Sequence, residues 1–302
     1  MASKKVKDED HIKQLIDWFF EKINMPLIEN IYINDLQNWD ALCSSLTIIN
    51  DLQRTKTEYH SLTKINHLEV IGVMQTLYIE QDCMLTLKNA ILKTKETAAL
   101  ADYKPIRELR NEAFGHPSAK GRKAGMYSRH FFDIVDANEQ HLKIINWENT
   151  GSITSGRFKL SDKVKENSAV TLKYLKELTD VFKDTITTQM SNYKIKAADL
   201  FNHTSYVFGK LLTKENDPIA IGSYQHSVDE EITKAKEALI ERNVFDDDFK
   251  RQIEVAEFFS TKLKLLFNQQ THKDTEFYAY ASTLRQNLSE LKKAIKDLEN
   301  VF

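Results

Sequence analysis

The chain has 302 residues, of which 41% are hydrophobic and 28% charged, so it can bury a sizeable core as one elongated domain or two smaller ones. Its eight glycines and four prolines leave too few turn residues for an all-β protein and favour a mostly α-helical fold. A formal net charge of −2 argues against a general nucleic-acid-coating protein, so any such ligand must bind a local basic patch.

The cysteines and the apolar runs bear on the compartment in which the protein works. Cys43 and Cys83 are too few for a disulfide framework and have no metal-ligand spacing around them, so we expect buried, reduced thiols. The first residues lack the apolar region of a secretory signal, and no apolar run approaches the length of a membrane span. These features predict a soluble, cytoplasmic protein with no membrane partner and no metal.

The first segment, residues 1–62, is expected to form an N-terminal helical arm. Apolar residues recur at helical spacing over 8–24 and predict one helix. Asn34 or Asp35 can cap a second helix, whose apolar pattern gives way to a polar run near 54–60 that predicts its end.

The central segment, 63–215, is expected to hold the helical core. Apolar residues at near-heptad spacing predict a long helix over 66–97. Glu80 and Gln81 interrupt this apolar seam, with Asp82 beside them. They are either a satisfied polar layer or solvated patch, or a carboxylate that orients an Arg or His from the next helix. Glu80 and Asp82 are therefore possible supporting residues of a site.

The next helix carries the side chains that are most typical of a site. Arg107, Arg110 and Asn111 recur at the spacing of one helical face. A glycine and a proline flank His116, so we expect the histidine at the end of this helix rather than inside it. A small basic loop follows, which is either simply solvated or grips a phosphate, and its cations are Lys120, Arg122 and Lys123.

The rest of the chain is predicted to be helical except for one short β-rich stretch. Two β-prone runs around a polar turn predict a small β-hairpin inserted near 126–160, which residues 156–161 could extend. A C-terminal helical hairpin is expected over 216–302, with a capping-box signal at 227–230. The apolar heptads of 277–302 suit either an antiparallel helical hairpin or a dimer seam.

A resemblance to a known family rests on Arg110-Asn111, followed after four residues by His116. This arrangement resembles the signature of the HEPN superfamily, which comprises small all-α domains of bacterial toxins, defence systems and RNA-processing enzymes. Residues 72–82 also resemble the first helix of HEPN-like bacterial proteins, so the resemblance covers about 66–118. It implies a HEPN-like helical bundle, to which this chain adds the β-hairpin and further N- and C-terminal helices.

The resemblance also implies an activity, metal-independent RNA cleavage by attack of the 2′-hydroxyl on the adjacent phosphate, without a cofactor. His116 would exchange the proton, Arg110 would hold the phosphate, and Asn111 would orient the phosphate or the histidine. Arg107 would widen the cationic groove. Six residues of a continuous helix would put His116 roughly 120° around from Arg110, so either the turn at Gly115 redirects His116 or two copies share one cleft. We prefer the homodimer with a shared cleft, as the resemblance implies.

Other interpretations of the same residues stay open. His116 can cap a helix C-terminus while Arg110 and Asn111 fasten a loop. In a different functional class, a HEPN-like domain without catalysis would bind RNA or a nucleotide or regulate a partner enzyme. A third hypothesis is a helical scaffold whose terminal heptads bind another protein. For a nuclease toxin or antiviral effector, an antitoxin is a possible protein partner.

Overall fold

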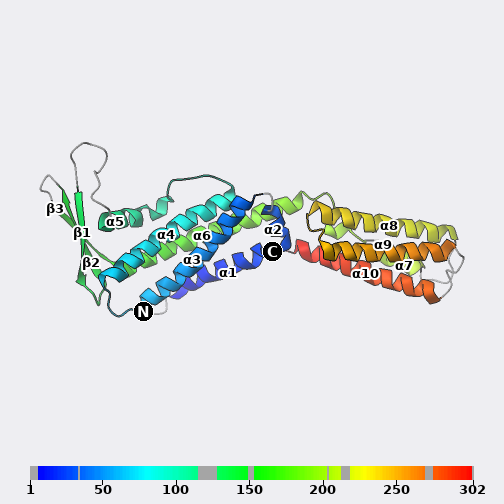
Figure 1. Ribbon diagram of the computed structural model, residues 1–302, viewed down its shortest axis with the longest axis horizontal. Helices are drawn as coiled ribbons and strands as arrows, with labels where there is room; N and C mark the ends of the chain where they lie inside the picture. Colours follow the sequence, from blue (N-terminus) through cyan, green and yellow to red (C-terminus); the bar gives the residue numbers. More distant parts are fainter. Residues whose placement is uncertain are drawn as a thin grey trace. The chain divides into compact units, whose positions relative to one another are not determined.

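The computed structural model describes residues 6–32, 35–114, 128–148, 153–202, 204–211, 218–268 and 275–300 (Figure 1). The fold is mostly α-helical with one small antiparallel sheet, which confirms the predicted fold class. The chain divides into two compact units: unit 1 comprises Met1–Glu21 and Asp35–Phe182, and unit 2 comprises Lys22–Asn34 and Lys183–Phe302.

These units do not follow the expected division into 1–62, 63–215 and 216–302. The main reason is that the second helix of the expected N-terminal arm, α3 (Leu36–Ser61), packs along α4 (His67–Leu92) inside unit 1. Its buried face therefore belongs to the same core as the long helix that follows it.

Unit 1 is a bundle of long helices with the sheet packed against it (Figure 1). The apolar seam of α4 is buried as predicted and meets residues of α5, the sheet and α6. An aromatic cluster of Trp18, Phe19 and Phe182 joins α1 to α6. The remaining helices of this unit are α1 (Val6–Ile23), α5 (Lys104–Phe114) and α6 (Leu160–Ser191), whose last turns continue into unit 2.

Several helix ends differ from the predictions. After the first helix ends at Ile23, a short helix that was not predicted, α2 (Pro26–Tyr32), begins at its proline. Helix α3 continues through the polar run at 54–60 to Ser61, since Lys56 and Tyr59 are buried rather than solvated. Helix α4 has the capping box of Asn66 and its N3 residue, but ends at Lys93 in the left-handed conformation, before the expected end at 97.

The β-hairpin is confirmed, and a third strand extends it. The strands β1 (Ser128–Asp136), β2 (His141–Glu148) and β3 (Ile153–Lys159) form an antiparallel sheet in the order β1-β2-β3. Gln140 lies in the turn between β1 and β2, and its Oε1 accepts a hydrogen bond of 2.6 Å from the hydroxyl of Tyr59 on α3. This bond ties the hairpin to α3, while α5 packs against β1 and β2.

Unit 2 is a second helical bundle, in which α10 (Thr275–Glu299) packs along α9 (Asp247–Asn268). The heptad residues of α10 are buried in the core of this unit, which favours the helical-hairpin interpretation of the seam. The predicted helix start at 227–230 is wrong, because α8 (Pro218–Glu241) begins at its proline. This unit also contains α2, a 3-10 helix (Ala197–Asp199) and α7 (Thr204–Leu211).

A buried arginine fastens the C-terminal end of unit 2. Arg242, directly after α8, donates hydrogen bonds to the carbonyl oxygens of Ala238 and Ile195 at 2.8 and 2.7 Å. It also forms an ion pair with Glu299, the last residue of α10, and its Cζ lies 4.5 Å from the centroid of the Tyr193 ring. The Arg242 side chain is fully buried, and Glu299 is the carboxylate that neutralises its charge there.

We expect Glu299→Gln to lower the free energy of unfolding of unit 2 by about 1.5–3 kcal/mol, the range of a hydrogen bond to a charged group. Thermal unfolding followed by far-UV circular dichroism measures this loss. The matched control is Glu290→Gln on the exposed face of the same helix, which should change the stability by less than about 0.5 kcal/mol. Equal effects of the two substitutions would contradict the prediction.

Candidate functional site

Helix α5 presents two arginines to α4. Ile106 is buried in the core of unit 1 and Leu109 packs against that core, so α5 has a fixed inner face. Arg107 and Arg110, each one residue further along the helix, both reach the ring of Tyr78 on α4. The geometry therefore brings together two guanidinium groups that the sequence predicted to share a face.

Arg107 binds a carboxylate and a hydroxyl of α4. Its Nη1 donates to Oδ1 of Asp82 at 2.6 Å, its Nη2 donates to the hydroxyl of Tyr78 at 2.8 Å, and its Cζ lies 4.1 Å from the ring centroid. Its side chain is 19% exposed. The sequence left two interpretations of the polar residues in the α4 seam. For Asp82, the contact agrees with a carboxylate that orients an arginine of the next helix.

Arg110 has different partners. Its Nη1 donates to Oδ1 of Asn111 and its Nη2 to Oε1 of Gln75, each at 3.2 Å, and its Cζ lies 4.7 Å from the centroid of the Tyr78 ring. Both acceptors are neutral amides. In the part of the chain that the structure describes, no carboxylate lies within ion-pair distance of this guanidinium, so its positive charge is not neutralised there.

Four predicted site residues, His116, Lys120, Arg122 and Lys123, lie outside the described residues. The convergence of His116 on Arg110 and Asn111 therefore stays a prediction. Sequence reasoning missed Gln75 and Tyr78, although these two and Asp82 follow one another at i, i+3 and i+7 on α4. That polar stripe was the signal that could have found them.

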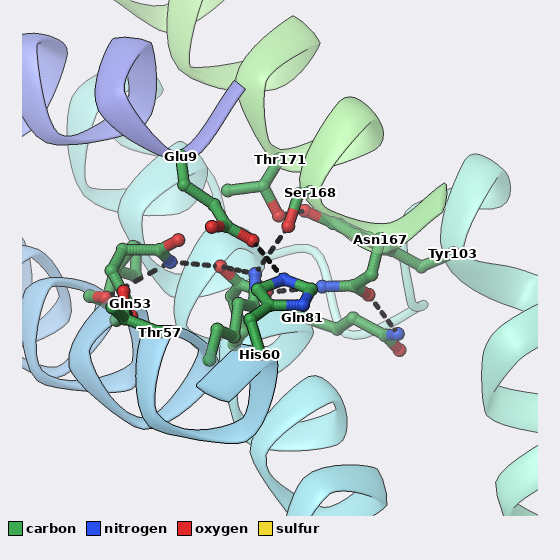
Figure 2. A network of polar contacts seen from close by, with 12 residues as sticks. Glu9, Gln53, Thr57, His60, Gln81, Tyr103, Asn167, Ser168 and Thr171 are labelled. Atoms are coloured by element: carbon green, nitrogen blue, oxygen red, sulfur yellow. Dashed lines mark hydrogen bonds and ion pairs between the residues drawn. The ribbon is translucent and has the colours of Figure 1, made fainter. Parts of the chain in front are cut away.

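Glu80 takes part in a different structure, a buried polar network between α3, α4 and α6. Figure 2 labels Gln53, Gln81 and Asn167 of this network. Gln53 Nε2 donates to Glu80 Oε1 at 2.6 Å, and Lys56 Nζ lies 2.6 Å from Glu80 Oε2. Asn167 of α6 also donates to Glu80 and accepts from Nε2 of Gln81. The predicted supporting role of Glu80 at the arginines finds no contact here, and the polar-layer interpretation holds for Glu80 and Gln81.

Most polar atoms of the network are paired, and the exceptions are the side-chain oxygens of Gln53 and Gln81. Lys56 Nζ also donates to Oγ of Ser168 at 3.2 Å, and the hydroxyls of Tyr103 and Thr171 share a hydrogen bond of 2.7 Å beside it. Burial raises the pKa of Tyr103, and the charge of Glu80 raises it further. The hydroxyl of Tyr103 therefore stays protonated, and the network lies too deep to meet a ligand from solvent.

The buried thiol of Cys83 is no nucleophile. Burial raises its pKa to about 11, and the charges of Asp82 and Glu80 add to this shift. The thiol is therefore protonated at neutral pH, and the thiolate is the reactive form. Of the residues that the structure describes, no three His, Cys, Asp or Glu gather in a way that could hold a metal ion.

Comparisons with known proteins add no family. Within the described part of the chain, none of the helices combines the length and apolar character needed to cross a membrane. Neither a scan against protein-family models nor searches of curated proteins and of solved structures found a match.

Proposed function

We propose that the protein is a metal-independent endoribonuclease of the HEPN type, with Arg110, Asn111 and His116 as its catalytic residues. One observation carries the proposal. The guanidinium of Arg110 on α5 is positively charged and has no carboxylate partner among the described residues. Two of its N–H groups bind neutral amides, which leaves further donors for a phosphate.

The chemistry is an internal transesterification. A histidine takes the proton of the RNA 2′-hydroxyl, the 2′-oxygen bonds to phosphorus, and the bond from phosphorus to the 5′-oxygen breaks after a proton is returned to that oxygen. The products are a 2′,3′-cyclic phosphate and a 5′-hydroxyl. Arg110 stabilises the charge that grows on the phosphate oxygens, and Asn111 orients the guanidinium through its amide oxygen.

The biological role that follows is a toxin or an antiviral effector that stops growth by cutting RNA, restrained by an antitoxin or another partner. A second candidate is a HEPN-like protein that binds RNA or a nucleotide without cutting it. One observation favours this second function. In the arginine cluster, which comprises Arg107, Arg110, Gln75, Tyr78 and Asp82, Arg110 is the one cation without a described carboxylate partner. A single cation of this kind is enough to bind a phosphate.

Labelled single-stranded RNA incubated with the protein and a chelator tests the proposal. We expect cleavage to products with 2′,3′-cyclic phosphate ends, and no cleavage of the same RNA when every 2′-hydroxyl is methylated. Arg110→Gln should lower the rate about 100- to 1000-fold, as expected for a lost donor to a developing oxyanion.

The matched control is Arg285→Gln, an exposed arginine of α10, which should cut RNA at the wild-type rate. Cleavage that requires a divalent metal, or that persists on the methylated RNA, would refute the proposed chemistry. Retention of RNA without cleavage would support the non-catalytic alternative instead.

A further inference from the structure

The two arginines of the site, Arg107 and Arg110, lie one helical turn apart and differ in whether a carboxylate neutralises them. Arg107 donates to a carboxylate at 2.6 Å, whereas the hydrogen bonds of Arg110 among the described residues go to amide oxygens at 3.2 Å. The pair of Arg107 and Asp82 therefore carries no net charge, and the net positive charge of the cluster belongs to Arg110.

We infer that Arg107 is a positioning residue and that Arg110 is the phosphate-binding residue of the cluster. Asp82 neutralises Arg107, and Arg107 fixes the Tyr78 ring beside Arg110. The inference rests on the proposed function and deepens it, because it states how many phosphates this cluster binds. It also differs from the sequence-based expectation that Arg107 widens a cationic groove.

The contacts of Arg107 explain why it does not bind a phosphate itself. Nη1 and Nη2, which form the outer edge of the guanidinium, are engaged by Asp82 and by the hydroxyl of Tyr78. A phosphate would have to displace a carboxylate at 2.6 Å and would meet its negative charge. Arg110 offers its edge to weaker, neutral acceptors, which an anion can replace at lower cost.

Tyr78 contacts both arginines and so links the position of Arg107 to that of Arg110. Its hydroxyl accepts the hydrogen bond from Arg107, which fixes the position of the ring on α4. The same ring lies 4.7 Å from Cζ of Arg110, within the distance of a cation–π contact. Arg110 is therefore held by the ring and by Gln75 in one orientation before any phosphate arrives, and the chemical step depends on this orientation more than binding does.

The salt dependence of RNA binding measures the number of phosphates that a cluster neutralises. For single strands, the slope of log K against log salt concentration changes by about 0.7 for each phosphate contact. Binding of the fully 2′-O-methylated RNA, which cannot be cut, gives this slope for the full chain and its variants.

Three variants separate the two arginines. Arg110→Gln should reduce the slope by about 0.7, whereas the double variant Asp82→Asn/Arg107→Gln, which removes both charges of the neutral pair, should leave it unchanged. Asp82→Asn alone should increase the slope by about 0.7, since it releases the charge of Arg107. On cleavable RNA, the double variant should lower kcat about ten- to a hundredfold with little change in KM, because it misplaces Arg110.

A reduced slope in the double variant, equal to that of Arg110→Gln, would overturn the inference. An unchanged kcat in the double variant would do the same, since a positioning role predicts a loss. If RNA binds with these slopes but is never cut, the nuclease proposal fails while the charge assignment stands.

Should the wild-type protein fail to bind RNA at all, calorimetry with inorganic pyrophosphate tests the assignment without RNA. Wild type and the double variant should then bind pyrophosphate alike, and Arg110→Gln should abolish binding. Absence of binding to both RNA and pyrophosphate, or equal loss in the two variants, overturns the inference.

Discussion

Replacing Glu80 by alanine is expected to lower the free energy of unfolding of unit 1 by about 3–5 kcal/mol, the cost of breaking a buried ion pair from one side. Lys56 is 1% exposed and would remain as a buried cation without its carboxylate. Gln53 and Asn167 would each lose the acceptor of a hydrogen bond as well. The loss should be visible in denaturant unfolding followed by tryptophan fluorescence, since the three tryptophans all belong to unit 1.

Two further variants show whether the loss comes from the unpaired charge. Glu108→Ala, at an exposed carboxylate of α5, should cost less than about 0.5 kcal/mol. The double variant Lys56→Met/Glu80→Gln removes both charges and keeps an amide for the network, so it should cost less than half of what Glu80→Ala costs. A double variant as unstable as Glu80→Ala would show that packing, and not charge, determines the stability here.

The network also bears on the arginine cluster, because Glu80 lies between two of its members on α4. Residues two positions apart on a helix are about 200° apart, so Tyr78 and Asp82 lie on the side of α4 opposite to Glu80. Contacts of Glu80 with α3 and α6 thus fix the rotation of α4 about its axis. That rotation directs Tyr78 and Asp82 toward α5.

Much of the fold could be predicted because apolar periodicity is local. The seam of α4 and the heptads of α10 are buried as the spacing indicates, and the polar turn between β1 and β2 lies where it was expected. The end of α3 was predicted wrongly because Gln53 and Lys56 are polar yet buried, a state that depends on partners in α4 and α6. A pattern that counts only apolar residues cannot identify such a face.

The candidate site, too, could be predicted from the sequence only in part. Arg107, Arg110 and Asn111 belong to one helix, so their spacing alone predicts their common face. Tyr78 and Gln75 come from another helix, and their contacts with the arginines depend on how α4 and α5 pack. The sequence therefore predicts which arginines share a helical face, but not which of them a carboxylate neutralises.

Two inactive variants are expected to restore activity when they are mixed, if two copies of the chain share the cleft. His116→Ala should lower the cleavage rate about 100- to 10,000-fold, the range of a lost general acid or base, and Arg110→Ala should be similarly inactive. After subunit exchange, about half of the dimers are mixed, and each contains one intact pair of Arg110 and His116 from different chains. A wild-type dimer has two such pairs and a mixed dimer has one. The mixture should thus regain roughly a quarter of the wild-type rate.

The control for this complementation is His226→Ala, an exposed histidine of α8, which should remain active alone. The geometric reason for expecting complementation is that six residues of a continuous helix would put Arg110 and His116 roughly 120° apart, so such a helix would not direct both side chains of one chain to the same phosphate. A mixture that exchanges subunits yet stays as inactive as its components would mean that both residues act from one chain. Catalysis would then require the chain after α5 to turn His116 back toward Arg110, and the dimer would have no role in the chemistry.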